Sequence, residues 1–424
     1  MVNRITSLKS RLSPKVSSLF SSLFSSIDTN FPVMKNLALV AIFLLFIVPR
    51  HSYSQVELVR IDGSSSKANS VTIDSGVVNS DGNKLDVNEL RLLDFGKEIK
   101  AASSGTKISL IGGGTLGASS LTLKDETFAI QNVAGEIRLG VDAVTHLRFK
   151  SEELPLYAKA TPKEDLDQLF AKIKDNYQTV PGIVDTITES KVVFIYDEDV
   201  IEFKLEDVYG LILAQGSEKS EAEVNGVVSL TEGSQLNCLI KSVSANEVKA
   251  TVGDVADVVL PLSVVSRIEI RSNRLAFLSD LTPTSVKFQQ GAVFERQLQK
   301  DRNIAGGKLV LRDREKKVSR TFAKGLGTKS GMSVTFPNKG FDRFVTTLGI
   351  DASTNGNGVC KVKVNGDGKE LFTADLTGVD PPRPLDIEIT GIDQIELVIE
   401  FGNDFLDLSD HVNWCDARFV KKTE

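Results

Sequence analysis

The sequence predicts an all-β protein that contains several small domains. From Val56 to about Arg274, apolar and polar residues alternate in short runs between turn residues, which is the pattern of half-buried antiparallel strands. Further short alternating runs with Gly, Asn and Pro turns follow from Leu275 onward, as is typical of a β-sandwich. The chain has 424 residues, of which 41% are hydrophobic and 25% charged, so we expect about two to four globular domains.

The first 54 residues differ from the rest in charge and composition. They contain six basic residues and one acidic residue, a net charge of +5, whereas the whole chain carries −6 and the remainder therefore −11. Residues 37–48 form an unbroken apolar run of 12 residues, shorter than the roughly 20 residues of a membrane-spanning helix. Such a run after a basic segment is typical of a secretory signal.

Small residues follow this run at Ser52 and Ser54, which are positions −3 and −1 for a cleavage before Gln55. We therefore expect residues 1–54 to be a leader and signal peptide, with Met34 as the candidate true start. This predicts an exported protein that is secreted, periplasmic or held at the cell surface. A buried helix or an uncleaved N-terminal anchor is the alternative interpretation.

The middle of the chain contains a weak internal repeat. Each copy has a hairpin, an apolar strand and a short closing piece of the form V-x-x-h, where h is apolar. The closing pieces are Val87–Leu92, Val141–Leu147, Leu205–Leu211 and Leu262–Ile268. Their spacing of about 50 to 65 residues indicates a tandem of small β modules at residues 55–160 and 179–274. We expect SH3-like barrels, because a few short strands must close or pair to hide their edges.

One helix is expected to link these two groups of modules, within residues 161–178. Thr161 can serve as N-cap, with Pro162 in the first turn and Glu164 completing a capping box. Apolar residues then recur at helical spacing, at Leu166, Leu169, Phe170 and Ile173. The pattern predicts a helix over residues 162–176.

Residues 112–117 match the glycine-rich pattern G-x-G-x-x-G of dinucleotide-binding folds. That interpretation needs a helix to follow directly, because the pyrophosphate binds at the helix N-terminus. The residues that follow, Ser119 to Lys124, alternate like a strand instead. We therefore expect the glycines to form a hairpin loop.

The composition of the sequence changes at Leu275, and a series of motifs follows in order. They are Phe277–Pro283, Asp301–Asn303 with Gly306–Gly307, Phe322–Ser330, Phe341–Phe344 with Leu348–Asp351, Val364–Gly368, Pro381–Leu385 and His411–Arg418. This ordered series resembles the NPCBM family of carbohydrate-binding modules, over residues 275–424. The resemblance implies a galactose-binding-like β-sandwich, or jelly roll, with glycan-binding loops at one end.

The resemblance implies a set of ligand-binding residues in turn-like segments. The candidates for hydrogen bonding to sugar hydroxyls, or for stacking, are Lys329, Asp351, Asn355, His411, Asn413 and Trp414. Family members commonly carry His where this chain has Lys329, and a second Asp where it has Ala352. Trp414 can be a stacking platform or a core anchor on the last strand, and we favour the core anchor. His411 is equally compatible with an ordinary solvated loop.

Oxygen-rich loops and cysteines offer two weaker signals in the same domain. Ca²⁺ prefers six to eight oxygen ligands, and its candidate ligands here are Asp404, Asp407 and Asp410, without EF-hand spacing. Cys360 and Cys415 lie on expected strands and can pair if these strands are adjacent. We prefer two small buried side chains.

The sequence therefore predicts an exported, non-catalytic carbohydrate-binding protein whose partner is a polysaccharide or glycoconjugate. Three His and three Cys argue against a multi-metal enzyme, and the net charge of −6 argues against nucleic-acid binding. The first alternative is a structural or assembly protein whose β modules contact other cell-surface proteins. The second is an accessory or catalytic part of a glycoside hydrolase, because a carboxylate pair can be far apart in the chain.

Overall fold

The computed structural model describes residues 55–100, 105–216, 224–253, 255–289, 296–403 and 408–422. The predicted leader and signal peptide, residues 1–54, lies outside the described residues. The described residues belong to one compact unit, Ser54–Glu424. Among the described residues, no helix is both long enough and apolar enough to cross a membrane.

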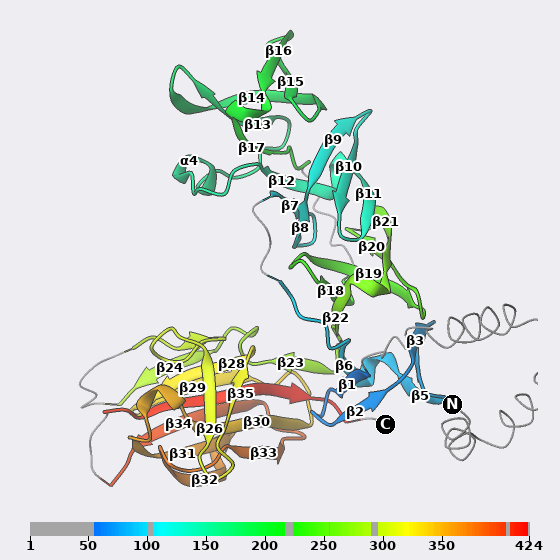
Figure 1. Cartoon of the computed structure of the whole chain (residues 1–424). Coiled ribbons are helices and arrows are strands. Elements are labelled where there is room, and N and C mark those ends of the chain that lie inside the picture. The colour runs from blue at the N-terminus through cyan, green and yellow to red at the C-terminus, as the bar shows by residue number, and fades with distance from the viewer. Residues whose placement is uncertain are drawn as a thin grey trace, which may run out of the picture. The chain divides into compact units, whose positions relative to one another are not determined.

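Residues 56–270 form four copies of one five-stranded antiparallel unit, which we call modules 1 to 4 (Figure 1). In each module the first strand pairs with both the second and the last strand. The third strand pairs with the second and the fourth. The second strand is long or bent, so that it is divided in two in modules 1 and 2. This antiparallel pairing confirms the predicted all-β architecture.

The elements of modules 1 and 2 are as follows. Module 1 contains β1 (Val56–Arg60), β2 (Ser65–Ala68), β3 (Val71–Asp74), β4 (Val77–Ser80), β5 (Asn83–Asp86), the 3-10 turn η1 (Val87–Glu89) and β6 (Leu90–Asp94). Module 2 contains β7 (Thr106–Leu110), β8 (Gly114–Ala118), β9 (Ser120–Lys124), β10 (Thr127–Asn132), β11 (Gly135–Gly140), η2 (Val141–Ala143) and β12 (Val144–Arg148). The glycines at 112–114 turn the chain between β7 and β8 with positive φ angles, which confirms the predicted hairpin loop.

Modules 3 and 4 repeat the same order after the short helix α4 (Pro155–Ala158). Module 3 contains β13 (Asp167–Ile173), β14 (Asn176–Ile187), β15 (Lys191–Tyr196), β16 (Asp199–Lys204), η3 (Leu205–Asp207) and β17 (Val208–Ile212). Module 4 contains β18 (Gly226–Leu230), β19 (Gln235–Val243), β20 (Glu247–Val252), β21 (Ala256–Pro261), η4 (Leu262–Val264) and β22 (Val265–Ile270).

The closing pieces recognised in the sequence are the 3-10 turn and the last strand of each module. The first apolar side chain of each turn packs against the core, and these residues are Val87, Val141, Leu205 and Leu262. The residues three and six positions later are fully buried in every copy: Leu90 and Leu93, Val144 and Leu147, Val208 and Leu211, Val265 and Ile268. Corresponding positions of the sequence repeat are therefore buried in all four modules.

The predicted helix over residues 162–176 is wrong, because its apolar part, Asp167–Ile173, is the strand β13. Leu169 and Phe170 are both fully buried but belong to different apolar clusters, one on each face of the sheet. β13 pairs with β14 on one side and β17 on the other, so its whole central run Asp167–Ala171 is buried. A strand that is buried on both faces has a continuous apolar run. In this sequence the apolar residues of that run also recur at helical spacing, which is the pattern of an amphipathic helix.

Strands of different modules also pair with one another, and the paired modules are not always consecutive in the sequence. The last strands of modules 1 and 4 pair through β6 and β22, and those of modules 2 and 3 through β12 and β17. The long second strands add further pairings, β9 with β14 and β8 with β19. As a result, one apolar cluster contains buried residues of all four modules.

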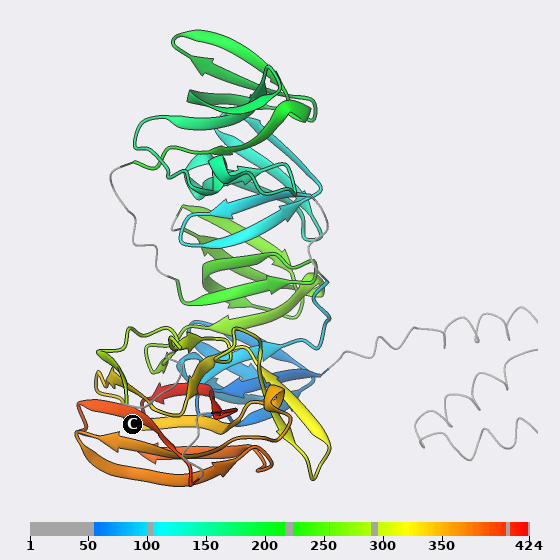
Figure 2. The ribbon, with the colours of Figure 1, turned by 90° about the vertical axis from the view of Figure 1, so that its left-hand side faces the viewer.

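Residues 275–420 form a two-sheet sandwich (Figure 2). Its elements are β23 (Leu275–Phe277), β24 (Ser285–Phe288), β25 (Gln299–Lys300), β26 (Leu309–Asp313), β27 (Val318–Phe322), β28 (Gly325–Lys329), β29 (Met332–Pro337), β30 (Arg343–Ile350), η5 (Ala352–Thr354), β31 (Val359–Gly366), β32 (Lys369–Thr377), β33 (Arg383–Glu388), β34 (Gln394–Phe401) and β35 (His411–Val420). The first sheet has the order β25-β28-β35-β30-β33, with β23 also on β35, and the second has the order β24-β29-β34-β31-β32. β26 and β27 form a separate hairpin.

The two cysteines of the sandwich are both buried and unbonded to each other. Cys360 lies in the main core from β31 of the second sheet, whereas Cys415 lies on β35 of the first sheet. Cys415 points to the opposite face, where it packs with Leu309, Leu311 and Phe322 of the β26–β27 hairpin. Their positions on different sheets and faces exclude a disulfide, so both act as small apolar side chains.

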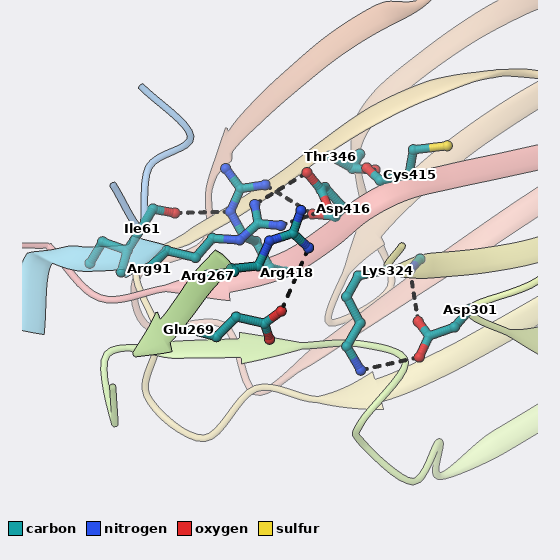
Figure 3. Close-up of polar contacts among 11 residues, drawn as sticks. Ile61, Arg91, Arg267, Glu269, Asp301, Lys324, Thr346, Cys415, Asp416 and Arg418 are labelled. Carbon is teal, nitrogen blue, oxygen red and sulfur yellow. Dashed lines mark hydrogen bonds and ion pairs between the residues drawn. The ribbon is translucent and has the colours of Figure 1, made fainter. Parts of the chain in front are cut away.

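The sandwich contacts module 1 through a buried arginine on β35 (Figure 3). Arg418 is 3% exposed and donates from Nε to the carbonyl of Ile61 over 2.9 Å. Its neighbour Asp416 accepts from both terminal nitrogens of Arg91, at 3.0 and 3.2 Å. Asp416 has a φ of 52°, at the irregularity in the pairing of β30 with β35. Burial, followed by the nearby Arg91, lowers the pKa of Arg418 to about 10.

We expect the substitution Arg418→Ala to lower the free energy of unfolding by about 2–4 kcal/mol, because it leaves the Ile61 carbonyl without its donor and removes a buried side chain. Urea unfolding of the full chain, followed by the fluorescence of the single Trp, measures this directly. Arg302→Ala, at an exposed arginine, is the control and should change stability by less than about 0.5 kcal/mol. Equal stability of the two variants would contradict the role given to Arg418.

Candidate functional site

The structure brings four of the six predicted ligand residues together at one end of the first sheet. β28, β35 and β30 lie side by side there, and Lys329 is directly opposite His411 in the ladder. Asp351 follows the last residue of β30, and its backbone N–H donates to the carbonyl of His411 over 2.8 Å. Asn413 is two residues further along β35 and lies on the same face as His411.

Asp351 is the centre of a buried hydrogen-bond network at this end. Its side chain is 2% exposed and accepts from the side chains of Asn303, at 3.1 Å, and Asn413, at 2.5 Å. It also accepts from the backbone N–H groups of Val310, at 3.3 Å, and Ser353, at 3.0 Å. The last of these contacts caps the turn η5. The carboxylate therefore ties four segments together, which fixes the loops around the site.

Asn413 is completely buried beside this carboxylate. Its amide nitrogen is the donor to Asp351, and its Oδ1 has no hydrogen-bond partner among the described residues. Burial prevents Asn413 from meeting a ligand at the surface in this arrangement. The side chains of Asp351 and Asn413 are therefore both buried and bonded to each other in this arrangement.

His411 and Lys329 are the two titratable side chains that face each other across the ladder at the site. His411 is partly buried, and burial lowers the pKa of its imidazole. Arg296 and Lys329 lower this pKa further, whereas Asp351 raises it. The shift is downward from a value near 6.5, so the imidazole is neutral at pH 7 and has one donor and one acceptor nitrogen. Lys329 is 4% exposed and adds positive charge beside it.

Asn355 lies at the exposed margin of the site, directly after η5. It has a φ of 57°, in the left-handed region that Asn tolerates better than most residues. The following glycine, Gly356, is packed so closely against the guanidinium of Arg314 that a side chain there would collide with it. The tip of the β26–β27 hairpin therefore lies over the loop that contains Asn355.

Trp414 is fully buried. It is therefore a core anchor, as favoured from the sequence, and the alternative prediction of a stacking platform is wrong. Val412 and Trp414 point into the core of the sandwich, because they alternate with His411 and Asn413 along β35. The indole Nε1 donates to Thr328 Oγ1 over 3.1 Å, and the ring centroid lies 6.3 Å from that of Phe344. A buried indole whose N–H is satisfied is a structural residue.

The structure gives no support to the calcium site. Asp410 is completely buried, and its Oδ1 accepts from the backbone N–H of Val359 over 2.8 Å. The other two candidates, Asp404 and Asp407, lie outside the described residues. Within the described ranges, no group of three or more His, Cys, Asp and Glu side chains is placed to hold a metal ion.

Comparison with known families identifies the C-terminal part of the chain. Residues 274–420 match the family model described as the NPCBM/NEW2 domain. These residues are an NPCBM/NEW2 domain. The match covers the sandwich and leaves modules 1 to 4 outside it. No curated protein matches the chain.

Several solved carbohydrate-binding modules are similar to the NPCBM domain. One is the CBM51 of Clostridium perfringens GH95, solved with methyl-galactose, at 24% identity over 34% of this chain and 99% of that one, with a TM-score of 0.32. Another is the CBM51-2 and INT domains of Clostridium perfringens ZmpB, solved with GlcNAc, at 22% identity and a TM-score of 0.32. That match covers 48% of this chain and 38% of the other.

Three residues of the site were not found from the sequence. Asn303 and Arg314 come from segments before β30, and Arg296 precedes β25, so nothing in their local pattern relates them to His411. The signal that could have found the two arginines is the density of basic residues between positions 296 and 329 of the NPCBM domain. Asn303 belongs to the motif Asp301–Asn303, but nothing in that motif relates it to its partner Asp351, which is 48 residues away.

Proposed function

We propose that the protein is an exported, non-catalytic carbohydrate-binding protein whose NPCBM domain recognises a glycan through the loops around His411. The observation that supports this most is the convergence of Lys329, Asp351 and His411 at one end of a sandwich that matches this family. A neutral imidazole is suited to a sugar, because it can donate to one hydroxyl and accept from another.

In this proposal the predicted residues have three roles. His411 and Asn355 contact the glycan, because both are accessible and carry donor and acceptor atoms. Lys329 acts mainly through its charge. Asp351 and Asn413 hold the loops in place, and Trp414 supports the sheet from the core side. Recognition then depends on hydrogen bonds, without the indole platform that many sugar sites use.

A glycan array probed with the full chain tests this function. We expect binding to at least one glycan, and a loss of about tenfold in affinity on His411→Ala, which is the effect of one or two lost hydrogen bonds. Asn355→Gly, which removes the amide but keeps the left-handed backbone accessible, should weaken binding similarly. His146→Ala is the matched control, since His146 is partly buried in module 2 and outside the NPCBM domain. Absence of binding to any glycan would overturn the proposal.

A second function, assembly with other proteins, is favoured by one feature of module 3. Ile183, Ile195 and Val200 are direct neighbours across three strands, and Ile183 and Val200 are 52% and 68% exposed. An exposed apolar row of this kind is typical of a protein contact. Val200→Asp should abolish a partner interaction of the modules without changing glycan binding. Equal loss of both would show that the substitution only unfolds the chain.

A further inference from the structure

The segment that borders the site is strongly basic, although the protein as a whole is acidic. Residues 296–329 contain eleven Lys and Arg residues and three Asp and Glu residues, a net charge of +8, and the whole chain carries −6. Five of the eleven cations, against two acidic residues, lie on the β26–β27 hairpin, residues 309–322, which we call the basic hairpin. Its cations are exposed, including Arg312, Arg314 and Lys317.

The basic hairpin lies against the site rather than elsewhere on the sandwich. At its start, the backbone N–H of Val310 donates to Asp351, the centre of the buried network. At its tip, the Arg314 guanidinium packs on Gly356, next to Asn355. The hairpin is anchored on the outer face of the first sheet by Leu309, Leu311 and Phe322, which pack on Cys415. Its position relative to the loops is therefore fixed by packing at both ends.

Four cations of the basic hairpin, Arg312, Arg314, Lys317 and Arg320, form no ion pair within the described part of the chain. Ion pairs occupy Lys316, with Asp313, and Lys324, with Asp280 and Asp301. Three arginines of this segment make neutral contacts: Arg302 bonds a carbonyl, Arg312 a serine hydroxyl, and Arg320 stacks on the Phe322 ring at 4.7 Å. Guanidinium groups that are exposed and unpaired are available to bind carboxylate or sulfate in a bidentate manner.

The positive field reaches the contact residues themselves. Arg296 and Lys329 both lower the pKa of His411, which means that each lies close enough to disfavour a further positive charge there. The same positive charges would attract an anionic group at the site. A net positive region on an acidic protein also steers anionic ligands toward it.

From this juxtaposition, we propose that the glycan recognised at the His411 end is polyanionic, carrying uronate or sulfate groups that bind the arginines of the basic hairpin. The inference rests on the proposed carbohydrate-binding function and specifies the class of its ligand. The sugar hydroxyls meet His411 and Asn355, while the acidic groups meet Arg314 and the neighbouring cations.

The test compares immobilised heparin, polygalacturonate and a neutral galactan as probes for the full chain. We expect the chain to bind heparin or polygalacturonate more tightly than the galactan, with an affinity that falls as salt rises. The charge-reversal variant R312E/R314E should weaken this binding by at least about tenfold. The matched control is K67E/K84E, which reverses two exposed cations of module 1 and gives the same net charge. It should change the affinity by less than about twofold.

The possible outcomes distinguish a failure of the polyanionic ligand from a failure of carbohydrate binding itself. Binding to the neutral galactan alone, without salt dependence, overturns the polyanionic ligand and leaves carbohydrate binding intact. Equal weakening by R312E/R314E and K67E/K84E overturns the role of the basic hairpin, because net charge alone then explains the effect. Tighter binding of a DNA duplex or of phosphatidylserine vesicles than of either acidic glycan also overturns it. Failure to bind any glycan overturns both proposals.

Discussion

Trp414→Ala is expected to lower the free energy of unfolding of the NPCBM domain by about 3–5 kcal/mol, the usual cost of truncating a large buried aromatic side chain. The indole is completely buried against Phe344 on the core face of β35, and its N–H bonds Thr328. Alanine leaves a cavity that the surrounding strands cannot fill, since β35 is held by β28 on one edge and β30 on the other.

Circular dichroism during urea unfolding of the full chain measures this loss, because the variant lacks the fluorescent residue. Trp414→Phe is the graded control and should cost less, about 1–2 kcal/mol, since it keeps most of the volume and loses the bond to Thr328. A Trp414→Ala variant that is as stable as the parent and has lost glycan binding would contradict this account. That result would place the indole in the binding site.

Asp351→Ala is expected to cost about 3 kcal/mol and to abolish glycan binding, because it leaves several buried donors without an acceptor. Those donors are the side chains of Asn303 and Asn413 and the backbone N–H groups of Val310 and Ser353. Without the carboxylate, η5 loses its cap and the basic hairpin loses its tie to β30. Asp351→Asn should be nearly as damaging, because its amide would place a donor against other donors.

Trp414 fluorescence reports the unfolding of Asp351 variants, because this single Trp lies in the NPCBM core. Asp375→Ala is the control, since its side chain is 80% exposed and lies 3.8 Å from Lys361. We expect that change to alter stability by less than about 0.5 kcal/mol. If Asp351→Ala weakened binding without any loss of stability, Asp351 would be a contact residue and the positioning role would be wrong.

The repeat of the middle region could be predicted because its signal is local. The V-x-x-h pieces contain a 3-10 turn and the start of a strand, and their apolar positions are buried in all four copies. The number of modules and their pairing could not be predicted, because β6 pairs with β22 across more than 170 residues. The helix prediction for the segment that contains β13 fails for a related reason. Its burial on both faces depends on β14 and β17, which a local pattern does not contain.

The site was predicted in part, through the family resemblance. The resemblance identified His411, Lys329 and Asp351, and the structure places them at one sheet end. It did not indicate which of the predicted side chains are accessible. On β35 this depends on which face each residue takes and on the basic hairpin that covers the outer face, so that Asn413 is buried and His411 is partly open. That arrangement is set by tertiary contacts.

Amide hydrogen exchange of the full chain, with and without the best glycan of the array, tests the central claim most directly. We expect slower exchange on glycan addition in the loop after β30, residues 351–357, in the tip of the basic hairpin and around His411, with modules 1 to 4 unchanged. Protection confined to the modules, or protection of the NPCBM domain only at its opposite end near β23, would contradict it.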